Sequence, residues 1–192
     1  MLFQIVNRFH PKRDLVEAQI RGVYHREYGA RLADFPNTLV ALFDEDGFPV
    51  CAAGLRVEVD GFFSERYLDD ALEATLSRIW KRPVYRENIA EISNLAGCRS
   101  GASLVLMQHI THWLREQGIT WAVFTATTRL RAMLRRTGVP ALDVCAADSA
   151  RVPDPTQWGT YYETAPRVCA IHDDMVLVRT PDQRHEPLAA FA

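Results

Sequence analysis

The chain has 192 residues, of which 48% are hydrophobic and 10% aromatic, enough to build the core of one domain without covalent or metal support. Its 22 basic and 24 acidic residues nearly balance, so no overall charge attracts the chain to nucleic acid or to an anionic membrane. No run reaches the roughly 18 apolar residues of a membrane span, and the first residues, MLFQIVNRFHPKRD, lack the charged-then-apolar order typical of a signal peptide. We therefore expect a cytoplasmic protein with neither nucleic acid nor the membrane interior as partner.

The predicted elements of the N-terminal half alternate between extended and helical patterns. A turn at Asp44 to Gly47 lies between two extended runs and predicts a hairpin. On the second run Gly54, Arg56, Glu58 and Asp60 are expected to share one face. In chain order we predict a strand over 2–9, a helix over 13–29, strands over 38–43 and 49–59, and a helix over 65–80.

The C-terminal half contains the most informative stretch, in which an apolar strand around Glu91 runs through a glycine-bearing turn into an amphipathic helix that Gly118 ends. Residues 1–179 are predicted to form one domain, and residues 180–192 a weakly ordered tail. The remaining predictions are a buried strand over 121–127, a basic helix over 129–137, strands over 141–146 and 166–171, and an aromatic loop over 153–162.

The glycine-bearing turn, from Gly97 to Gly101, indicates an anion site. A strand that feeds a turn at a helix start offers unpaired backbone N–H groups and the positive end of the helix dipole. This pattern predicts a ligand with a diphosphate or phosphopantetheine group, although an ordinary strand-to-helix turn has the same sequence features.

The four cysteines, Cys51, Cys98, Cys145 and Cys169, lie far apart and form no C-x-x-C pair. This spacing argues against a zinc site, and no other cluster indicates a metal or a redox cofactor. We expect the protein to need no metal.

Five ordered blocks carry a family resemblance that runs from about Val23 to about His172. The blocks FPNTLVALFDEDGFPVCAAGLR, ERYLDDALE, IAEISNLA, WAVFTATTRLR and WGTYYETAPRV resemble the thermostable hemolysin family, which is placed in the acyl-CoA N-acyltransferase (GNAT) superfamily. The order of elements also resembles that superfamily. The resemblance implies an α+β fold in α/β/α layers, with a mixed, mainly antiparallel central sheet flanked by helices on both faces.

The resemblance implies an enzyme, an N-acyltransferase that moves an acyl group from an acyl-CoA or acyl-carrier-protein thioester to a small amine acceptor, in the biosynthesis of a signal or secondary metabolite. The co-substrate would be acyl-CoA or acyl-phosphopantetheine. An acyl carrier protein would be a partner, and an acidic one would dock on a basic helix; a solvated helix face has the same pattern. The arginines of that helix are Arg129, Arg131, Arg135 and Arg136.

A narrower resemblance links the hairpin ending at Arg56 and the strand around Glu91 to the acyl-homoserine lactone synthases, in which an E-x-S-R strand follows such a hairpin. It implies that Arg56 and Glu91 bind or position the amine. Asn94 stands where that pattern has arginine, so a different acceptor is implied. A carboxyl group in an apolar strand has the raised pKa that a base needs, which makes Glu91 the candidate base. The alternative is a structural ion pair between Glu91 and Arg56.

The superfamily's binding loop, R/Q-x-x-G-x-G/A, matches this sequence only in part. With its first glycine on Gly101, Cys98 takes the place of the arginine or glutamine, and Leu134 takes that of the tyrosine that protonates the thiolate. Backbone N–H groups near Leu95 and Ala96 would stabilise the oxyanion. The resemblance assigns donor binding to Leu95, Ala96, Gly97, Cys98, Arg99, Ser100, Gly101, Ala102 and Ser103.

Two other functions remain open on the sequence. The family name suggests a membrane-active haemolysin, although each strongly apolar segment fits a buried core better than an exposed lytic surface. The imperfect loop and Leu134 also permit a non-catalytic acyl-CoA-binding module. Trp158, Tyr161 and Tyr162 would either line a pocket or close the edge of the core.

Overall fold

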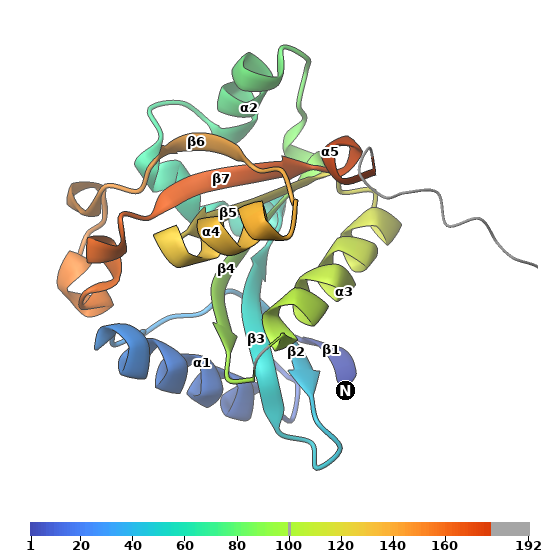
Figure 1. The fold of residues 1–192 in the computed structure, drawn as a ribbon, viewed down its shortest axis with the longest axis vertical. Helices are drawn as coiled ribbons and strands as arrows, with labels where there is room; N and C mark the ends of the chain where they lie inside the picture. The colour runs from blue at the N-terminus through green and yellow to red at the C-terminus, as the bar shows by residue number, and fades with distance from the viewer. Residues whose placement is uncertain (100, 178–192) are drawn as a thin grey trace, which may run out of the picture.

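The computed structural model describes residues 1–99 and 101–177, so the predicted tail over 180–192 lies outside the described residues. Seven strands form one sheet in the order β1-β2-β3-β4-β5-β7-β6 (Figure 1). Within the described chain β4 and β5 pair in parallel and the other neighbours antiparallel, which confirms the predicted mixed, mainly antiparallel sheet. The strands are β1 (Leu2–Val6), β2 (Thr38–Phe43), β3 (Pro49–Arg56), β4 (Ile89–Gly97), β5 (Trp121–Ala126), β6 (Leu142–Ala146) and β7 (Arg167–His172).

Helices cover both faces of the sheet, as predicted, with α3 and α4 in front of it in Figure 1. None of the described helices is long and apolar enough to cross a membrane. The α-helices are α1 (Arg13–Tyr28), α2 (Leu72–Trp80), α3 (Ala102–Glu116), α4 (Thr128–Arg136) and α5 (Asp173–Leu177). The short 3₁₀ helices are η1 (Glu58–Asp60), η2 (Phe63–Tyr67), η3 (Arg86–Asn88), η4 (Ser149–Arg151), η5 (Pro155–Trp158) and η6 (Tyr161–Thr164).

Strand β2 shows how the alternation of side chains builds two cores. Leu39 and Ala41 belong to the cluster that packs under α1, whereas Val40 and Leu42 belong to the cluster under α3. All four are almost fully buried. Because both faces are covered, β2 is a continuous apolar run rather than an alternating one. The predicted hairpin of β2 and β3 is confirmed, with Val40 opposite Ala53.

Three predicted elements were too long, and the first of them, the strand predicted over 2–9, ends at Val6. The strand predicted over 49–59 ends at Arg56, because the Asp60 carboxylate accepts a hydrogen bond from the Val57 N–H (3.1 Å) and closes η1. Glu58 and Asp60 therefore do not continue the strand face of Arg56. The helix predicted over 65–80 was wrong in its first part, which forms η2. The Glu65 carboxylate accepts from the N–H of Leu72 (3.0 Å), so α2 begins at that residue.

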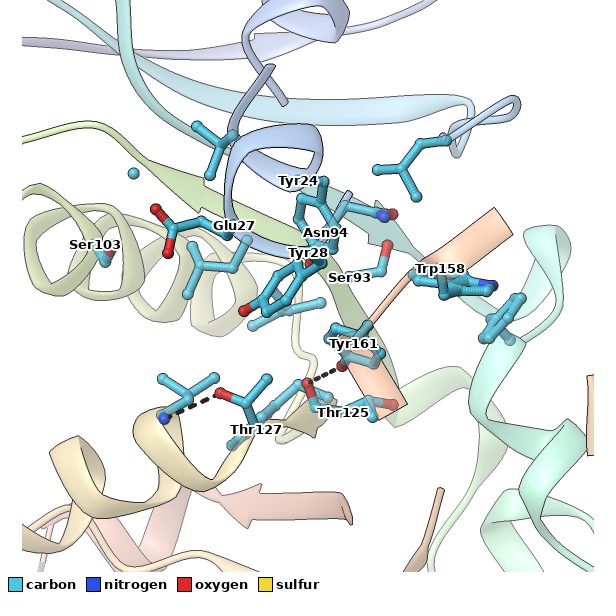
Figure 2. A pocket seen from close by; sticks show the side chains of 18 of the residues that line it. Tyr24, Glu27, Tyr28, Ser93, Asn94, Ser103, Thr125, Thr127, Trp158 and Tyr161 are labelled. Carbon is cyan, nitrogen blue, oxygen red and sulfur yellow. Dashed lines mark hydrogen bonds between the residues drawn. The ribbon is translucent and has the colours of Figure 1, made fainter. Parts of the chain in front are cut away.

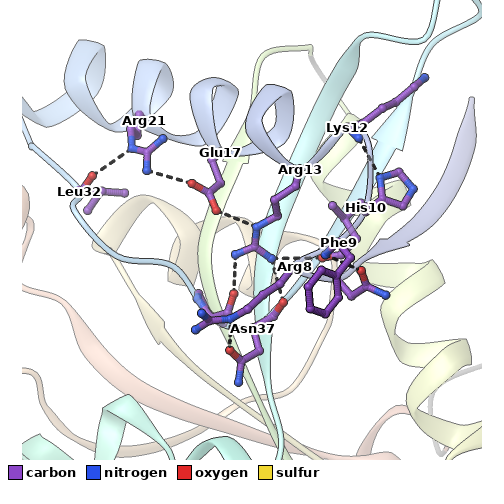
Figure 3. Close-up of polar contacts among 12 residues, drawn as sticks. Arg8, Phe9, His10, Lys12, Arg13, Glu17, Arg21, Leu32 and Asn37 are labelled. Atoms are coloured by element: carbon purple, nitrogen blue, oxygen red, sulfur yellow. Dashed lines mark hydrogen bonds and ion pairs between the residues drawn. The ribbon is translucent and has the colours of Figure 1, made fainter.

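The segment between α1 and β2 is fixed by the buried Arg13 (Figure 3). Its guanidinium donates to the carbonyls of Val6 (3.2 Å), Pro36 (2.6 Å) and Asn37 (2.8 Å). It also pairs with Glu17 of the same helix at 2.7 Å. One side chain thus ties α1, the end of β1 and the start of β2 together.

The parallel pair β4 and β5 is joined over only part of its length. Pairing runs from Ile89 opposite Trp121 to Ile92 opposite Phe124 and then stops. Beyond this point β4 has a bulge against β3, and Asn94 takes a left-handed backbone conformation with φ of 52°. Figure 1 shows the two strands leaving their paired stretch in different directions. The sheet therefore opens between its central strands.

Candidate functional site

A cleft of about 1070 Å³ lies where β4 and β5 separate. On one face of the sheet α3 and α4 line it, and we refer to this part as the α3/α4 side. On the other face its walls are the end of α1, the 3₁₀ helix η2 and the segments 32–34 and 152–161, which together form the α1/η2 side. The opening thus connects the two faces of the sheet.

The α3/α4 side begins at the glycine-bearing turn. Gly101 is the N-cap of α3 with φ of 79°, and the first turn of this 15-residue helix carries no acidic side chain. Arg99, Arg129 and Arg136 line the cleft around it. A helix N-terminus surrounded by arginines is an environment that stabilises a diphosphate or phosphate group.

The deeper part of the α3/α4 side is apolar. Its lining side chains come from β4, β5, α3 and α4, and several of them are only partly buried. An apolar channel that is open to solvent suits an alkyl chain or a pantetheine arm. These side chains are Leu95, Leu104, Met107, Phe124, Leu130 and Met133.

Glu91 lies on the α1/η2 side and is 2% exposed. Its two carboxylate oxygens accept hydrogen bonds from the backbone N–H groups of Phe63 (2.6 Å) and Ser64 (2.8 Å), so it holds η2 against the sheet. Burial raises the pKa of Glu91, while these N–H groups and the charge of Arg56 act in the opposite direction. A buried carboxyl group with a raised pKa is suited to accept a proton near neutral pH.

Arg56 of β3 stands opposite Glu91 of β4 in the sheet and also lines the cleft. No ion pair within 4.0 Å joins the two among the described residues, so the structural ion pair considered from the sequence is not formed. Glu91 instead accepts hydrogen bonds from the backbone N–H groups of Phe63 and Ser64 in η2.

Aromatic side chains form the outer wall of the α1/η2 side (Figure 2). Tyr28 and Tyr161 meet edge to face with ring centroids 5.3 Å apart, and Trp158 lies 5.4 Å from Tyr161. The Tyr161 hydroxyl donates to the carbonyl of Thr125 on β5 (3.5 Å). Burial raises the pKa of both Tyr28 and Tyr161, so their phenols stay protonated at neutral pH. The sequence left open whether Trp158 and Tyr161 line a pocket or close the edge of the core. In the structure both residues line the cleft and also pack against the core under α1.

Tyr28 was not predicted as a site residue. It lies at the end of the apolar stripe of the helix predicted over 13–29, and this position indicated that its ring packs in the core. The four-residue spacing from Tyr24 to Tyr28 could have indicated an aromatic site, because it places the two rings on the same side of α1, where they are in contact. Both line the cleft. Tyr162, in contrast, is absent from the lining, and its hydroxyl hydrogen-bonds that of Tyr67 (2.8 Å).

Gly159 allows the wall to form. It has φ of 54°, and a Cβ at this position would lie 2.0 Å from the carbonyl oxygen of Tyr28. The backbone of 157–160 thereby docks on the end of α1, with the Thr160 N–H donating to Tyr28 (2.9 Å) and the Arg31 N–H to Gln157 (2.7 Å). The end of α1 and the segment 157–160, which are distant in sequence, thus lie together in the wall of the α1/η2 side.

Comparison with known proteins decides the family. The profile of the thermostable hemolysin family matches residues 6–176. The chain belongs to the thermostable hemolysin family. No curated protein matches its sequence.

Solved structures show which fold this thermostable hemolysin family member has. It is similar to FeeM, an N-acyl amino acid synthase from uncultured soil microbes, with a TM-score of 0.60 and 14% identity over 90% of this chain and 92% of that one. It is similar to the AHL synthase LasI, with a TM-score of 0.59 and 13% identity over 89% of each chain. An acetyltransferase of the GNAT family from Staphylococcus aureus matches with a TM-score of 0.51 and 9% identity over 90% and 99%. The chain therefore has the GNAT fold.

The predicted donor-binding residues are only partly brought together in this thermostable hemolysin family protein. Ala96 and Ala102 are buried in the two cores and do not line the cleft. Ser100 lies outside the described residues. The predicted residues that line the cleft are Leu95, Gly97, Cys98, Arg99, Gly101 and Ser103, together with Arg56 and Glu91.

Leu134 stands where the superfamily pattern has a tyrosine, and it is buried at 6% exposure in the core beneath α3 and α4. It does not line the cleft. A hydroxyl group is therefore missing from that position, and the phenol of Tyr28 enters the cleft from the opposite face of the sheet.

Proposed function

We propose that this protein is an N-acyltransferase that moves an acyl group from the thioester of acyl-CoA or an acyl carrier protein to a small amine. The observation that carries the proposal is the end of β4–β5 pairing at Ile92 and Phe124, which opens one cleft to both faces of the sheet. A thioester entering from one face and an amine from the other would meet between the strands.

The α3/α4 side would bind the donor. Backbone N–H groups at the start of α3 and the side chains of Arg99 and Arg136 would hold phosphate oxygens, as expected for a helix N-terminus. The apolar channel beyond Leu104 and Met107 would take the acyl chain or the pantetheine arm. The thioester carbonyl would then lie beside the bulge of β4.

The α1/η2 side would bind the amine and remove its proton. An amine attacks a thioester only when it is neutral, and Glu91 would take up the proton as the C–N bond forms. The negative carbonyl oxygen would be stabilised by backbone N–H groups near Leu95 and Ala96, beyond the point where β5 pairs with β4. As the C–S bond breaks, the thiolate needs a proton, which the protonated phenol of Tyr28 would supply.

The arginines of α4 are relevant to the choice between CoA and a carrier protein. Arg129 is 91% exposed in its side chain and lies 3.9 Å from Glu27 across the mouth of the cleft, while Arg135 and Arg136 are also exposed. These charges would attract either the phosphates of CoA or the acidic surface of a carrier protein.

An acyl-transfer assay tests the proposal. Purified protein would be incubated with acyl-CoA and acyl-carrier-protein donors of several chain lengths and a pool of amines, and N-acyl products measured by mass spectrometry. Leu104→Trp should abolish product, because the indole fills the channel, whereas Gln108→Trp, exposed and one turn further along α3, should not. Failure of both donors to bind or react would contradict the proposal.

A non-catalytic acyl-CoA-binding module is the second candidate, because Leu134 leaves the superfamily's tyrosine position without a proton donor. Calorimetric titration with CoA separates the two. Donor binding without any N-acyl product from a broad amine pool would favour the module.

A further inference from the structure

Among the residues that line the α1/η2 side of the cleft, two buried hydrogen-bonding groups have no partner within the described residues. They are the Nε of Arg56 and the hydroxyl of Ser93, both buried atoms in residues that line the cleft. Leaving a buried polar group without a partner costs about 1–3 kcal/mol. Such groups at a cleft wall indicate that a bound molecule supplies the missing acceptors.

The two groups project from the same face of neighbouring strands. Arg56 pairs in register with Glu91, and Gly54, two residues earlier, pairs with Ser93. A Cβ at Gly54 would lie 2.5 Å from the Ser93 hydroxyl oxygen and 2.7 Å from Pro36. The glycine therefore leaves room for the Ser93 hydroxyl against β3, in a residue that also lines the cleft.

The charges around these groups favour an anion. Both oxygens of Glu91 already accept backbone hydrogen bonds, so its charge is partly satisfied by η2 rather than by Arg56. Arg66 adds a second cation at the cleft, where it stacks on Phe63 at 4.9 Å. Of the other acids in the lining, Glu27 lies 3.9 Å from Arg129, Asp154 accepts from Thr156 and Gln157 (2.7 Å), and Asp34 is exposed.

The aromatic wall beside Arg56 defines the rest of the ligand. Phe63 lies 5.9 Å from Trp158, which continues the wall to Tyr161 and Tyr28. Aromatic rings of this kind stabilise an apolar or planar body, and they contribute more when a polar anchor fixes its orientation.

We propose that the acceptor is a free amino acid with an apolar or aromatic side chain. Arg56 binds its carboxylate, the Ser93 hydroxyl donates to the same group, and the aromatic wall holds its side chain. The nitrogen of the neutral amine attacks the thioester carbon and the C–N bond forms, while the amine proton passes to Glu91. The C–S bond breaks, and the departing thiolate takes the proton of the Tyr28 phenol. This inference rests on the proposed N-acyltransferase function.

Matched pairs of acceptors test it. Each proteinogenic amino acid would be compared with its decarboxylated amine, for example phenylalanine with phenethylamine, at a saturating concentration of the donor that the protein uses. Since a site built to bind a polar group rejects ligands that lack it, kcat/KM should favour the amino acid by roughly 100-fold for the best pair.

Variants test whether Arg56 and Ser93 cause the preference for amino acids over their decarboxylated amines. Arg56→Met should raise KM for the amino acid by roughly 100-fold and leave the decarboxylated amine within about 3-fold, and Arg56→Lys should recover part of the loss. The smaller change Ser93→Ala should raise the same KM by about 10-fold. Arg31→Met, at an exposed arginine outside the lining, is the control. Thermal unfolding would show that each variant is folded.

The outcomes separate this inference from the function on which it rests. Equal rates for amino acids and their decarboxylated amines, or an unchanged preference in folded Arg56→Met and Ser93→Ala, would overturn the inference while N-acyl products still form. Absence of any N-acyl product would overturn both, through the proposed function itself.

Discussion

The two sides of the cleft are built in different ways. Much of the α3/α4 side comes from one continuous stretch, from Leu95 on β4 to Met107 on α3, completed by α4. The α1/η2 side gathers the end of α1, the segment 32–34, Arg56 and η2 and then the segment 152–161. One side therefore follows from local geometry, whereas the other exists only after distant segments have packed together.

The first prediction concerns a substitution that disrupts the backbone contact between Gly159 and the end of α1. In Gly159→Ala the new Cβ meets the Tyr28 carbonyl oxygen at 2.0 Å in a residue with φ of 54°. We expect a loss of about 3 kcal/mol or more, because the contact is with backbone that cannot move aside. Chemical unfolding measures it.

Gly61→Ala is the matched control for this substitution. Gly61 also has a positive φ, of 66°, but a Cβ there would meet nothing within 4 Å. Its cost should stay near 1 kcal/mol. CoA binding at low temperature should survive in both variants. Equal destabilisation of the two proteins would show that the docking of 157–160 on α1 contributes little.

The second prediction concerns the buried carboxyl group that joins η2 to the sheet. Folding raises the pKa of Glu91, so this group stabilises the fold fully below its unfolded pKa of about 4.3 and loses that contribution as pH rises through the folded pKa. The stability of the wild type minus that of Glu91→Gln should therefore be largest near pH 4 and fall toward pH 7. Urea unfolding over this range measures the difference.

Glu65 supplies the opposite case. Hydrogen bonding and pairing with Arg86 lower the pKa of Glu65, so its contribution is present above the unfolded pKa and is lost as pH falls through the folded pKa. The difference between the wild type and Glu65→Gln should grow with pH. A Glu91→Gln difference that also grew with pH would show that Glu91 is not the proton-binding group proposed.

The sequence predicted the two sides unequally, and for a physical reason. The glycine-bearing turn after the Glu91 strand is a local pattern, so the start of α3 and its place beside β4 could be read directly. The N–H groups that hold Glu91 come from Phe63 and Ser64 of η2, which lie just before the helix predicted over 65–80, in a stretch for which the sequence predicted no element. The unpaired Nε of Arg56 depends on that arrangement, because η2 satisfies the carboxylate that would otherwise pair with it.

A third prediction sharpens the comparison on the α3/α4 side. Arg136 lines the cleft, whereas its exposed neighbour Arg135 does not. Arg136→Ala should weaken CoA binding by roughly 5-fold at low salt, and Arg135→Ala by less than 2-fold, because solvent-exposed charge contacts are weak. The acceptor KM should stay the same in both. Isothermal titration at two salt concentrations measures the first effect, and equal losses would contradict it.

The smallest expected effect is on the hydroxyl pair behind the aromatic wall. Tyr162→Phe removes the partner of the Tyr67 hydroxyl, which lies 2.8 Å away. The free energy of unfolding should fall by about 1 kcal/mol, the usual cost of one lost hydrogen bond. Tyr85→Phe, at a residue that is 59% exposed, should have no measurable effect. Equal stability of Tyr162→Phe and the wild type would show that the pair is replaced by water.

A crystal structure with a non-hydrolysable thioether analogue of acyl-CoA tests the central claim most directly. The account predicts the pantetheine arm between β4 and β5 beyond Ile92 and Phe124, with the phosphates at the start of α3 and the acyl carbon facing the Glu91 side of the sheet. Electron density for the analogue on another surface, or an arm that never enters the gap between these strands, would contradict it.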